Sequence, residues 1–452
     1  MVAQISNEHE IGMVENHALD GYRPMHKYEE EGAKKRKRQQ TESFDRCYHW
    51  DELPNGPLIE IAGRLSNFDD LQVMYLVCSR WNSVLRESQC KFLDGGRAGC
   101  CGPQVPWLMM AEQESFERKG KGKAMRLFIY SLSFQSVRQL VTRLPPIKEN
   151  FSNCRLFSSH GWVLVVRTTG STMTMCLYNP FCSPSSHNYI PLPRLDTLSS
   201  SVSRFTLSAC PCTKSYTVMI VYASNKIGLW KPGDKVWTLV DHSLLSGVFI
   251  LDVIFYRGYY YVLDQLKHIF RLSGSDNNEL KWERLPSLFD GINDGSGHRY
   301  LWKAYFVVGD EEKLLVVVRL CLYPKTQPLF ELPHDYLTAG FRVVEILVSP
   351  KRFDNRVKDV NSLGTTSLFV GRNQAFAIDV PKANNPSASG YYGCKPNCIY
   401  FTDDRLYILT TAKFGKGKDM GVYNMEDGSI DRHFQGLSLQ DHSPMLWVEP
   451  HL

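Results

Sequence analysis

The hydrophobic and polar positions along the chain follow two different periods, and the change between them comes near residue 95. The first period is helical, because apolar side chains recur at i, i+3, i+4 and i+7 in Leu58, Ile61, Ala62 and Leu65. That spacing predicts a short helix with one apolar face. A second and a third helix are predicted from the apolar positions Leu71, Met74, Cys78, Trp81, Val84 and Leu85.

The predicted helix boundaries come from capping residues. Pro57 precedes the first apolar stripe, and its fixed φ suits the first helical position. Ser66, with Asp69 three residues later, is typical of the start of a second helix. Three short helices bury little surface, and a core smaller than about 70–80 residues rarely supplies more than a few kcal/mol. We therefore expect this segment to pack against a partner.

Beyond about residue 105 the helical period nearly vanishes, and short segments rich in β-branched and aromatic residues take over. They are bounded by Gly, Asn, Asp or Pro, which is the signature of strands. Examples are residues 162–166, 216–222, 258–263, 314–318 and 341–348.

A weak internal repeat organises these strands. Leu192-Pro193, Trp237 and Leu285-Pro286 each close a group of strands and recur about every 46 residues, near the period of four-stranded propeller blades. A propeller leaves only short, protected sheet edges, and we favour it over a pair of β-sandwiches. The fold expected is mainly β: a propeller of six or seven blades over 105–452, after a three-helix module at 46–92 and a glycine-rich linker at 93–104.

Residues 1–45 are predicted to be a disordered basic tail, since they combine many charges with few apolar side chains. Five consecutive cations repel one another and cannot be packed together. Such a run is typical of the nuclear-import signals that bind in acidic grooves of their receptors. The alternative is a tail that only aids solubility. The run consists of Lys34, Lys35, Arg36, Lys37 and Arg38.

Composition narrows the class of protein. The 452 residues are 43% hydrophobic, so a sizeable core is available, and 52 basic against 47 acidic residues give a net charge of only +5. The first twenty residues are polar and predict no secretory signal, and no apolar run is long enough to span a membrane. The thirteen cysteines are therefore expected to stay reduced, and we expect nuclear or cytoplasmic localisation.

Candidate chemistry is sparse. Cys210-Pro-Cys212 and Cys394 with Cys398 lack the repeated spacing of a zinc site, and Cys176, Cys321 and Cys398 are interpreted as small buried hydrophobes. The sequence has no nucleophile elbow, and its histidines follow no metal-ligand spacing. We expect no metal, no cofactor and no enzymatic activity of its own.

The helical segment resembles an F-box, the module that docks a protein onto the Skp-type adaptor of a cullin-based ubiquitin ligase. Trp50, Leu53-Pro54, Asp70-Leu71 and Val77-Cys78 before Trp81 carry the resemblance, against the alternative of an ordinary helical hairpin. Asn55-Gly56-Pro57 departs from the usual pattern and is expected to reduce adaptor affinity. The resemblance implies adaptor contacts through Leu53, Pro54, Leu58, Ile61, Leu65, Leu71, Val77, Cys78 and Trp81.

The remainder resembles the C-terminal β-propeller domain of a large plant F-box family, often labelled F-box/kelch-repeat. The matching segments are His160-Gly-Trp162, Tyr178-Asn-Pro-Phe181, residues 393–401 and residues 421–424. The double glycine of true kelch repeats is absent, so the kelch label is loose here.

Together the two resemblances imply a substrate-recognition subunit of an SCF-type E3 ligase. Its partners would be the Skp-type adaptor, the cullin reached through it, and a protein target that the sequence does not identify. The alternative is a nuclear binding protein that acts outside the ligase. A nucleic-acid partner is disfavoured, because the basic segments at 34–38 and 118–123 lack interleaved aromatic residues.

Overall fold

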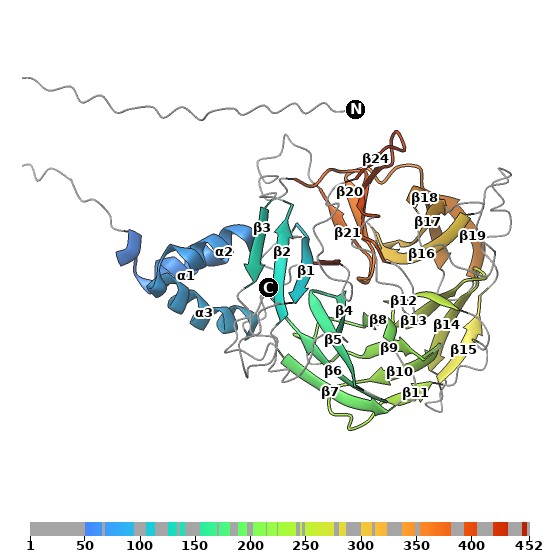
Figure 1. Cartoon of the computed structure of the whole chain (residues 1–452), viewed down its shortest axis with the longest axis horizontal. Coiled ribbons are helices and arrows are strands. Elements are labelled where there is room, and N and C mark those ends of the chain that lie inside the picture. Colours follow the sequence, from blue (N-terminus) through green and yellow to red (C-terminus); the bar gives the residue numbers. More distant parts are fainter. Residues whose placement is uncertain are drawn as a thin grey trace, which may run out of the picture. The chain divides into compact units, whose positions relative to one another are not determined.

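The computed structural model shows a helical segment followed by a ring of β-sheets (Figure 1). It describes residues 50–449 except 66–67, 95–104, 114–124, 133–135, 141–153, 170, 181–188, 197–201, 214, 224, 241–244, 246–248, 275–279, 286–299, 310–311, 323–336, 349–352, 381–392, 405–418 and 433–444. The predicted tail, its cationic run from Lys34 to Arg38, and most of the predicted linker lie outside the described residues.

The helical segment contains the three helices predicted from the sequence. A short 3-10 helix η1 (Trp50–Glu52) precedes α1 (Asn55–Arg64), α2 (Phe68–Val77) and α3 (Ser79–Asp94), and both α1 and α2 pack on α3. The last helix runs two residues past the predicted boundary at 92. The interior of the module is formed by the buried side chains of Leu58, Ala62, Met74, Trp81 and Leu85.

The predicted start of the first helix was wrong by two residues. α1 begins at Asn55, and the N–H of Leu58 donates to Pro54 O (3.2 Å), so Pro57 occupies the third helical position. The first four N–H groups of a helix have no partner within it, and a proline there removes no hydrogen bond. The expected cap at Ser66 lies outside the described residues, and α2 starts at Phe68.

The described strands form six sheets, which confirms the β-propeller and fixes the number of blades at six. Blade 1 is β25–β1–β2–β3, blades 2 to 5 follow as β4–β7, β8–β11, β12–β15 and β16–β19, and blade 6 has the order β21–β20–β22–β23–β24. The bounds in the first three blades are β25 (Leu446–Val448), β1 (Trp107–Gln113), β2 (Met125–Ser131), β3 (Ser136–Leu140), β4 (Cys154–Ser159), β5 (Trp162–Thr169), β6 (Thr172–Tyr178), β7 (Tyr189–Asp196), β8 (Val202–Leu207), β9 (Val218–Tyr222), β10 (Lys226–Trp230) and β11 (Thr238–Val240). Those in the other three are β12 (Ile250–Tyr256), β13 (Tyr259–Asp264), β14 (Ile269–Gly274), β15 (Leu280–Arg284), β16 (Tyr300–Val308), β17 (Leu314–Leu322), β18 (Leu337–Val348), β19 (Phe353–Asp359), β20 (Thr366–Val370), β21 (Phe376–Asp379), β22 (Cys398–Phe401), β23 (Gly421–Asn424) and β24 (Ile430–Asp431).

One sheet joins the two ends of the β region. β25, from the C-terminal end, pairs antiparallel with β1, with Trp107 opposite Val448 and Met109 opposite Leu446. The first strand of each sheet order faces the axis, and successive inner strands contact one another along the series β25, β4, β8, β12, β16 and β21. A pair of β-sandwiches has no such ring, so that alternative is excluded.

The repeat signals lie where the sequence predicted them. Leu192 is in β7, Trp237 directly precedes β11, and Leu285 directly follows β15, so each marks the outer strand of its blade. Each of the three side chains is buried. The predicted periodicity therefore reflects how one blade packs on the next.

Candidate functional site

The turn between η1 and α1 carries the Leu53-Pro54 pair and is held by backbone contacts. The N–H of Leu53 donates to Trp50 O (3.2 Å), and the indole Nε1 of Trp81, from α3, donates to the same oxygen (3.2 Å). A buried tryptophan normally finds a partner for its N–H. Here that partner fixes the turn against α3.

Arg80 adds a second restraint on this turn. Its Nη2 donates to Leu53 O (2.7 Å) and to Asn55 Oδ1 (2.9 Å), so one guanidinium group spans the residues before and after Pro54. Asn55 is part of the departure from the F-box pattern. Its side chain therefore has a defined role, as an acceptor that ties the start of α1 to α3.

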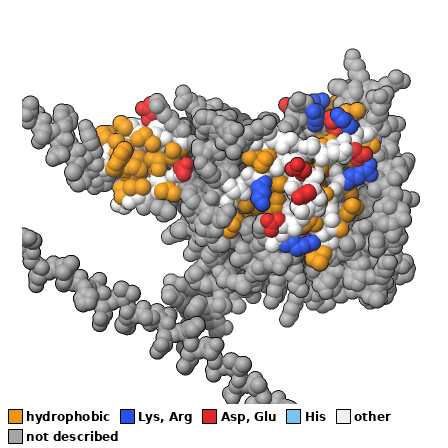
Figure 2. Space-filling view, turned by 90° about the horizontal axis from the view of Figure 1, so that it is seen from above, with side chains coloured by type: hydrophobic (Ala, Val, Ile, Leu, Met, Phe, Trp, Pro, Cys, Tyr) orange, Lys and Arg blue, Asp and Glu red, His pale blue; other side chains and the backbone are white. Residues whose placement is uncertain are grey.

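Large apolar side chains remain on the outside of the helical module. Trp50 is 65% exposed and Val77 is 51% exposed, and Ile61 and Val73 are exposed as well. Figure 2 shows hydrophobic side chains gathered on one face of the helical part of the molecule. We use the term apolar face for the exposed side chains of Trp50, Ile61, Val73 and Val77, which the helical module does not bury; exposed apolar side chains of this size are typical of an interaction site.

The structure separates the predicted adaptor-contact residues into two groups. Leu58 and Trp81 are buried and pack the module internally, where they would support a docking surface without lining it. Pro54, Ile61 and Val77 are exposed, whereas Leu53, Leu65 and Cys78 are half-buried. The side chain of Leu71 lies outside the described residues. Adaptor binding by this set stays a prediction.

Val73 was not among the residues predicted from the sequence. It stands four residues before Val77 on α2, so the two side chains share one helix face. The i, i+4 spacing of two valines was the signal available. It was obscured because α2 is apolar around most of its circumference, and no single stripe stands out.

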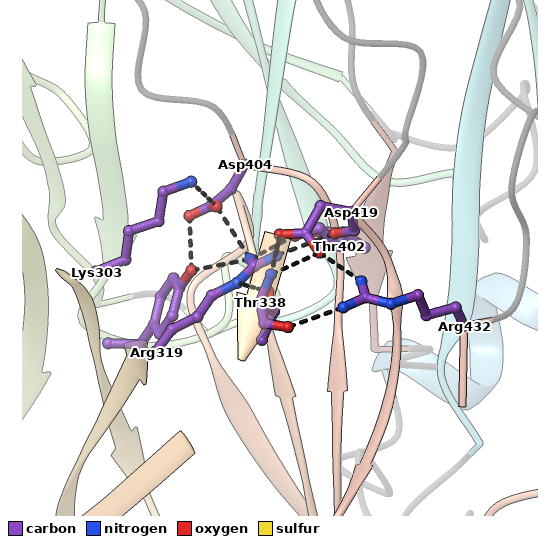
Figure 3. A network of polar contacts seen from close by, with 8 residues as sticks. Lys303, Arg319, Thr338, Thr402, Asp404, Asp419 and Arg432 are labelled. Carbon is purple, nitrogen blue, oxygen red and sulfur yellow. Dashed lines mark hydrogen bonds and ion pairs between the residues drawn. The ribbon is translucent and has the colours of Figure 1, made fainter. Parts of the chain in front are cut away.

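In the propeller, charged side chains gather in a buried network between blades 5 and 6 (Figure 3). Arg319 on β17 is fully buried; its Nη1 pairs with Asp404 Oδ1 (3.1 Å) and its Nη2 with Asp419 Oδ2 (2.9 Å). Lys303 from β16 also pairs with Asp404, and Arg432 Nη1 donates to Asp419 Oδ1 (2.9 Å). The network joins strands that are far apart in the sequence.

The charges in this network compensate one another. Burial alone would raise the pKa of Asp404, but Lys303 and Arg319 hold it well below its ordinary value. The pKa of Asp419 is likewise lowered, because Arg319 and hydrogen bonds from Thr338 and Arg432 outweigh its burial. Both aspartates are therefore ionised at neutral pH. Since Arg319, Lys303 and both aspartates are buried, the network serves to connect blades and offers no surface to a substrate.

A serine–histidine contact also needs a chemical interpretation. Ser159 Oγ lies 3.0 Å from His160 Nδ1, but Ser159 is buried, donates to Gln374 Oε1 and accepts the N–H of Leu207 (3.1 Å). Both the proton and an acceptor position of this hydroxyl are used within the fold. His160 and Gly161 have φ values of +50° and +73°, as a two-residue hairpin turn between β4 and β5 requires. The contact is structural.

The cysteines and helices add two further observations. Cys176, Cys321 and Cys398 are buried, as interpreted from the sequence, and the N–H of Cys212 donates to Cys210 Sγ (3.3 Å) within the turn between β8 and β9. Within the part of the chain that the structure describes, no helix combines the length and apolarity needed to cross a membrane.

Comparison with known proteins identifies the family of the propeller. The family described as KIB1-4 beta-propeller matches residues 129–424. The chain belongs to this family. The match runs from β2 to the end of β23 and so includes blades 2 to 5 whole, whereas the three helices lie before it.

Two curated relatives come from Arabidopsis thaliana. An F-box/kelch-repeat protein is 27% identical over 247 residues, which are 52% of this chain and 57% of the relative. An F-box protein is 26% identical over 191 residues, 41% of this chain and 49% of the relative. The chain thus spans about half the length of the curated relatives it matches. These matches confirm the resemblance to plant F-box proteins that carry a β-propeller.

Solved structures show only distant likeness. A crystal structure of a protein from Lactobacillus plantarum is 10% identical and matches 76% of this chain and 99% of its own, with a TM-score of 0.34. The β-propeller domain of Cps50 (Swd1) from Myceliophteria thermophila is also 10% identical and matches 77% of this chain and 96% of its own, with a TM-score of 0.30.

Proposed function

We propose that the chain is the substrate-recognition subunit of a cullin-based, SCF-type E3 ubiquitin ligase. In this proposal the helical module docks the Skp-type adaptor, and the propeller holds a protein target. The observation that supports it best is the apolar face of Trp50, Ile61, Val73 and Val77 on a module too small to bury those side chains itself.

The proposed role requires no bond chemistry from this chain. A receptor that holds a target beside a ubiquitin-charged enzyme raises the effective concentration of the target's lysines. The described residues are consistent with such a role, since the Ser159–His160 contact and the network around Arg319 are both used to hold the fold together. The propeller supplies a rigid platform whose loops can vary.

Direct binding to a purified Skp-type adaptor tests the proposal. Val77→Asp places a charge in the apolar face, and we expect the affinity to fall at least about a hundredfold, because an unpaired charge would be desolvated in the interface. The matched control is Val236→Asp, which changes an exposed valine on the propeller and should leave the affinity unchanged. Equal affinities for wild type and Val77→Asp would contradict the docking face. No binding by the wild type would favour a binding protein that acts outside the ligase.

A further inference from the structure

The propeller contains a small cavity on its axis. Its volume is about 170 Å³, and its lining includes Ser159 from β4, Phe255 from β12, Val308 from β16, Phe376 from β21 and Glu449 just after β25. These elements belong to five different blades, and β4 and β12 are not neighbours in the ring. A cavity lined from so many inner strands lies where they converge.

One side of this cavity is built from a closed set of hydrogen bonds. The N–H of Gln374 donates to Ser158 O (2.7 Å), and Gln374 Oε1 accepts from both Ser159 Oγ and Thr206 Oγ1, the latter at 2.8 Å. This side chain thereby ties blade 6 to blades 2 and 3. The wall is pre-formed, so a guest would not have to order it.

The other walls are apolar and remain partly open. Phe255, Val308 and Phe376 are half-buried, whereas Val307 beside Val308 on β16 is fully buried. Phe376 is held in place by stacking on Phe369, with ring centroids 5.2 Å apart. Inner-strand residues keep exposed surface where they face open space, and here that space is the cavity.

In the part of the chain that the structure describes, two titratable side chains line the cavity, Glu449 and His160. Among the described lining residues the one carboxylate is Glu449, and none is a lysine or an arginine. A carboxylate has about four lone-pair positions, and Glu449 is only half-buried. Two cations on the inner strands have acidic partners: Arg204 lies 3.6 Å from Asp252, and Lys303 pairs with Asp404.

We propose that this axial pocket binds one cationic side chain, lysine or arginine, presented by the target protein; the inference rests on the proposed receptor function. The cavity is smaller than the roughly 300–1,000 Å³ of sites for drug-sized ligands, which limits the guest to about one side chain. Aromatic faces attract a desolvated cation, and Glu449 supplies the countercharge. The propeller would then recognise a basic residue of the target protein at its axis.

The probes are the capped tripeptides acetyl-Gly-Arg-Gly-amide and acetyl-Gly-Lys-Gly-amide, titrated into the full chain by calorimetry or ligand-observed NMR. We expect saturable binding of both, and at least about tenfold weaker binding of acetyl-Gly-Gln-Gly-amide. Equal binding of the glutamine peptide, or no binding of either cationic peptide, would overturn the proposal. Binding of agmatine without the arginine peptide would also overturn it, because the pocket would then serve a free amine.

Glu449→Gln keeps the size of the side chain and removes its charge, and we expect it to weaken the cationic peptides about tenfold. Glu426→Gln, at an exposed position in the turn between β23 and β24, is the matched control and should bind as wild type does. An unchanged affinity in Glu449→Gln would contradict the assigned countercharge. Adaptor affinity is measured on the same samples; loss of peptide binding with adaptor binding intact would show that the pocket, and not the receptor function, had failed.

Discussion

At the scale of single residues, Trp237 shows how one side chain connects two blades. It is buried at the edge of blade 3, and its indole Nε1 donates to Pro193 O in blade 2 (2.9 Å). The ring lies close over β10, where a Cβ on Gly228 would meet Trp237 Cε3 at 3.2 Å. Gly228 therefore allows the indole to approach the sheet.

We expect Trp237→Ala to lower the free energy of unfolding by about 3–5 kcal/mol, since it removes a large buried aromatic side chain. Trp237→Phe keeps most of the apolar volume and loses only the hydrogen bond to Pro193, for which about 1–2 kcal/mol is expected. Denaturant unfolding of the two variants measures both values. A midpoint unmoved by Trp237→Ala would mean that this residue does not hold the two blades together.

Asp252 gives the propeller a specific dependence on pH. Burial raises the pKa of this carboxyl to about 6, although Arg204 and the N–H of Phe306 oppose the shift. An unfolded aspartate has a pKa of about 3.9, so between about pH 4 and pH 7 the folded state holds a proton that the unfolded state releases. The free energy of unfolding therefore falls as the pH rises through this range.

Relative to Asp252→Asn, we expect the wild type to lose on the order of 2 kcal/mol of stability between about pH 4 and pH 7. Chemical denaturation at a series of pH values tests this expectation, with the exposed residue changed in Asp379→Asn as the control. Parallel pH profiles for wild type and Asp252→Asn would contradict the raised pKa.

At the scale of elements, the turn that carries Leu53-Pro54 is restrained by α3. Arg80 bridges Leu53 O and Asn55 Oδ1, and Trp81 bonds Trp50 O. The Asn55-Gly56-Pro57 departure was expected to weaken docking. That expectation stays a prediction. The structure shows that Asn55 helps to hold the turn, as an acceptor for Arg80.

Asn55→Asp should strengthen this restraint, because a carboxylate makes a charge-assisted hydrogen bond to Arg80. On an exposed surface the gain is small, and we expect adaptor binding to tighten by about two- to fivefold. Arg80→Gln should weaken binding both in the wild type and in the Asn55→Asp variant, and it should abolish the difference between them. A gain from Asn55→Asp that persists without Arg80 would show that the two side chains do not act together.

Blades 5 and 6 are joined through Arg319. Its removal would leave Asp404 and Asp419 buried without their shared cation, so Arg319→Leu is expected to destabilise the protein by about 3–5 kcal/mol. Arg342→Leu is the matched control, because Arg342 pairs with Asp359 on the surface (2.7 Å), where an ion pair contributes about 0–1 kcal/mol. Equal losses of stability in the two variants would contradict the structural role of the buried network.

How far the elements could be predicted from the sequence depends on the range of the forces involved. Helical spacing identified all three helices, since periodicity is a local property. It could not separate Leu58, which is buried, from Ile61, which is exposed, because both stand on the predicted apolar stripe and only the crossing of the other helices decides between them. The network around Arg319 left no local signal, since residues that bond to each other in it lie as many as 101 residues apart.

At the scale of the whole molecule, the blade count could be predicted only as a range, because the repeat is regular in only part of the chain. The inner strands of blades 2 to 5 start at residues 154, 202, 250 and 300, close to the predicted period. Blade 5 contains the long strand β18, so blade 6 begins only at Thr366, with β20. Within blade 6, strands β20 and β22 run parallel. A constant period over this region overestimates the number of blades.

The molecule combines a small helical module that has an exposed apolar face with a six-bladed propeller closed by its C-terminal strand. In the proposed function, the first element binds the ligase and the second binds the target. Both roles depend on whether the helical module anchors the chain to the adaptor.

Co-expression of the full chain with the Skp-type adaptor and the cullin, followed by size-exclusion chromatography with mass determination, decides this question. We expect a complex with one copy of each protein. We also expect that Leu53→Ala combined with Pro54→Ala removes the chain from this complex while the propeller keeps its wild-type melting temperature. A wild-type chain that elutes alone, or a double variant that stays in the complex, would contradict the proposed anchoring.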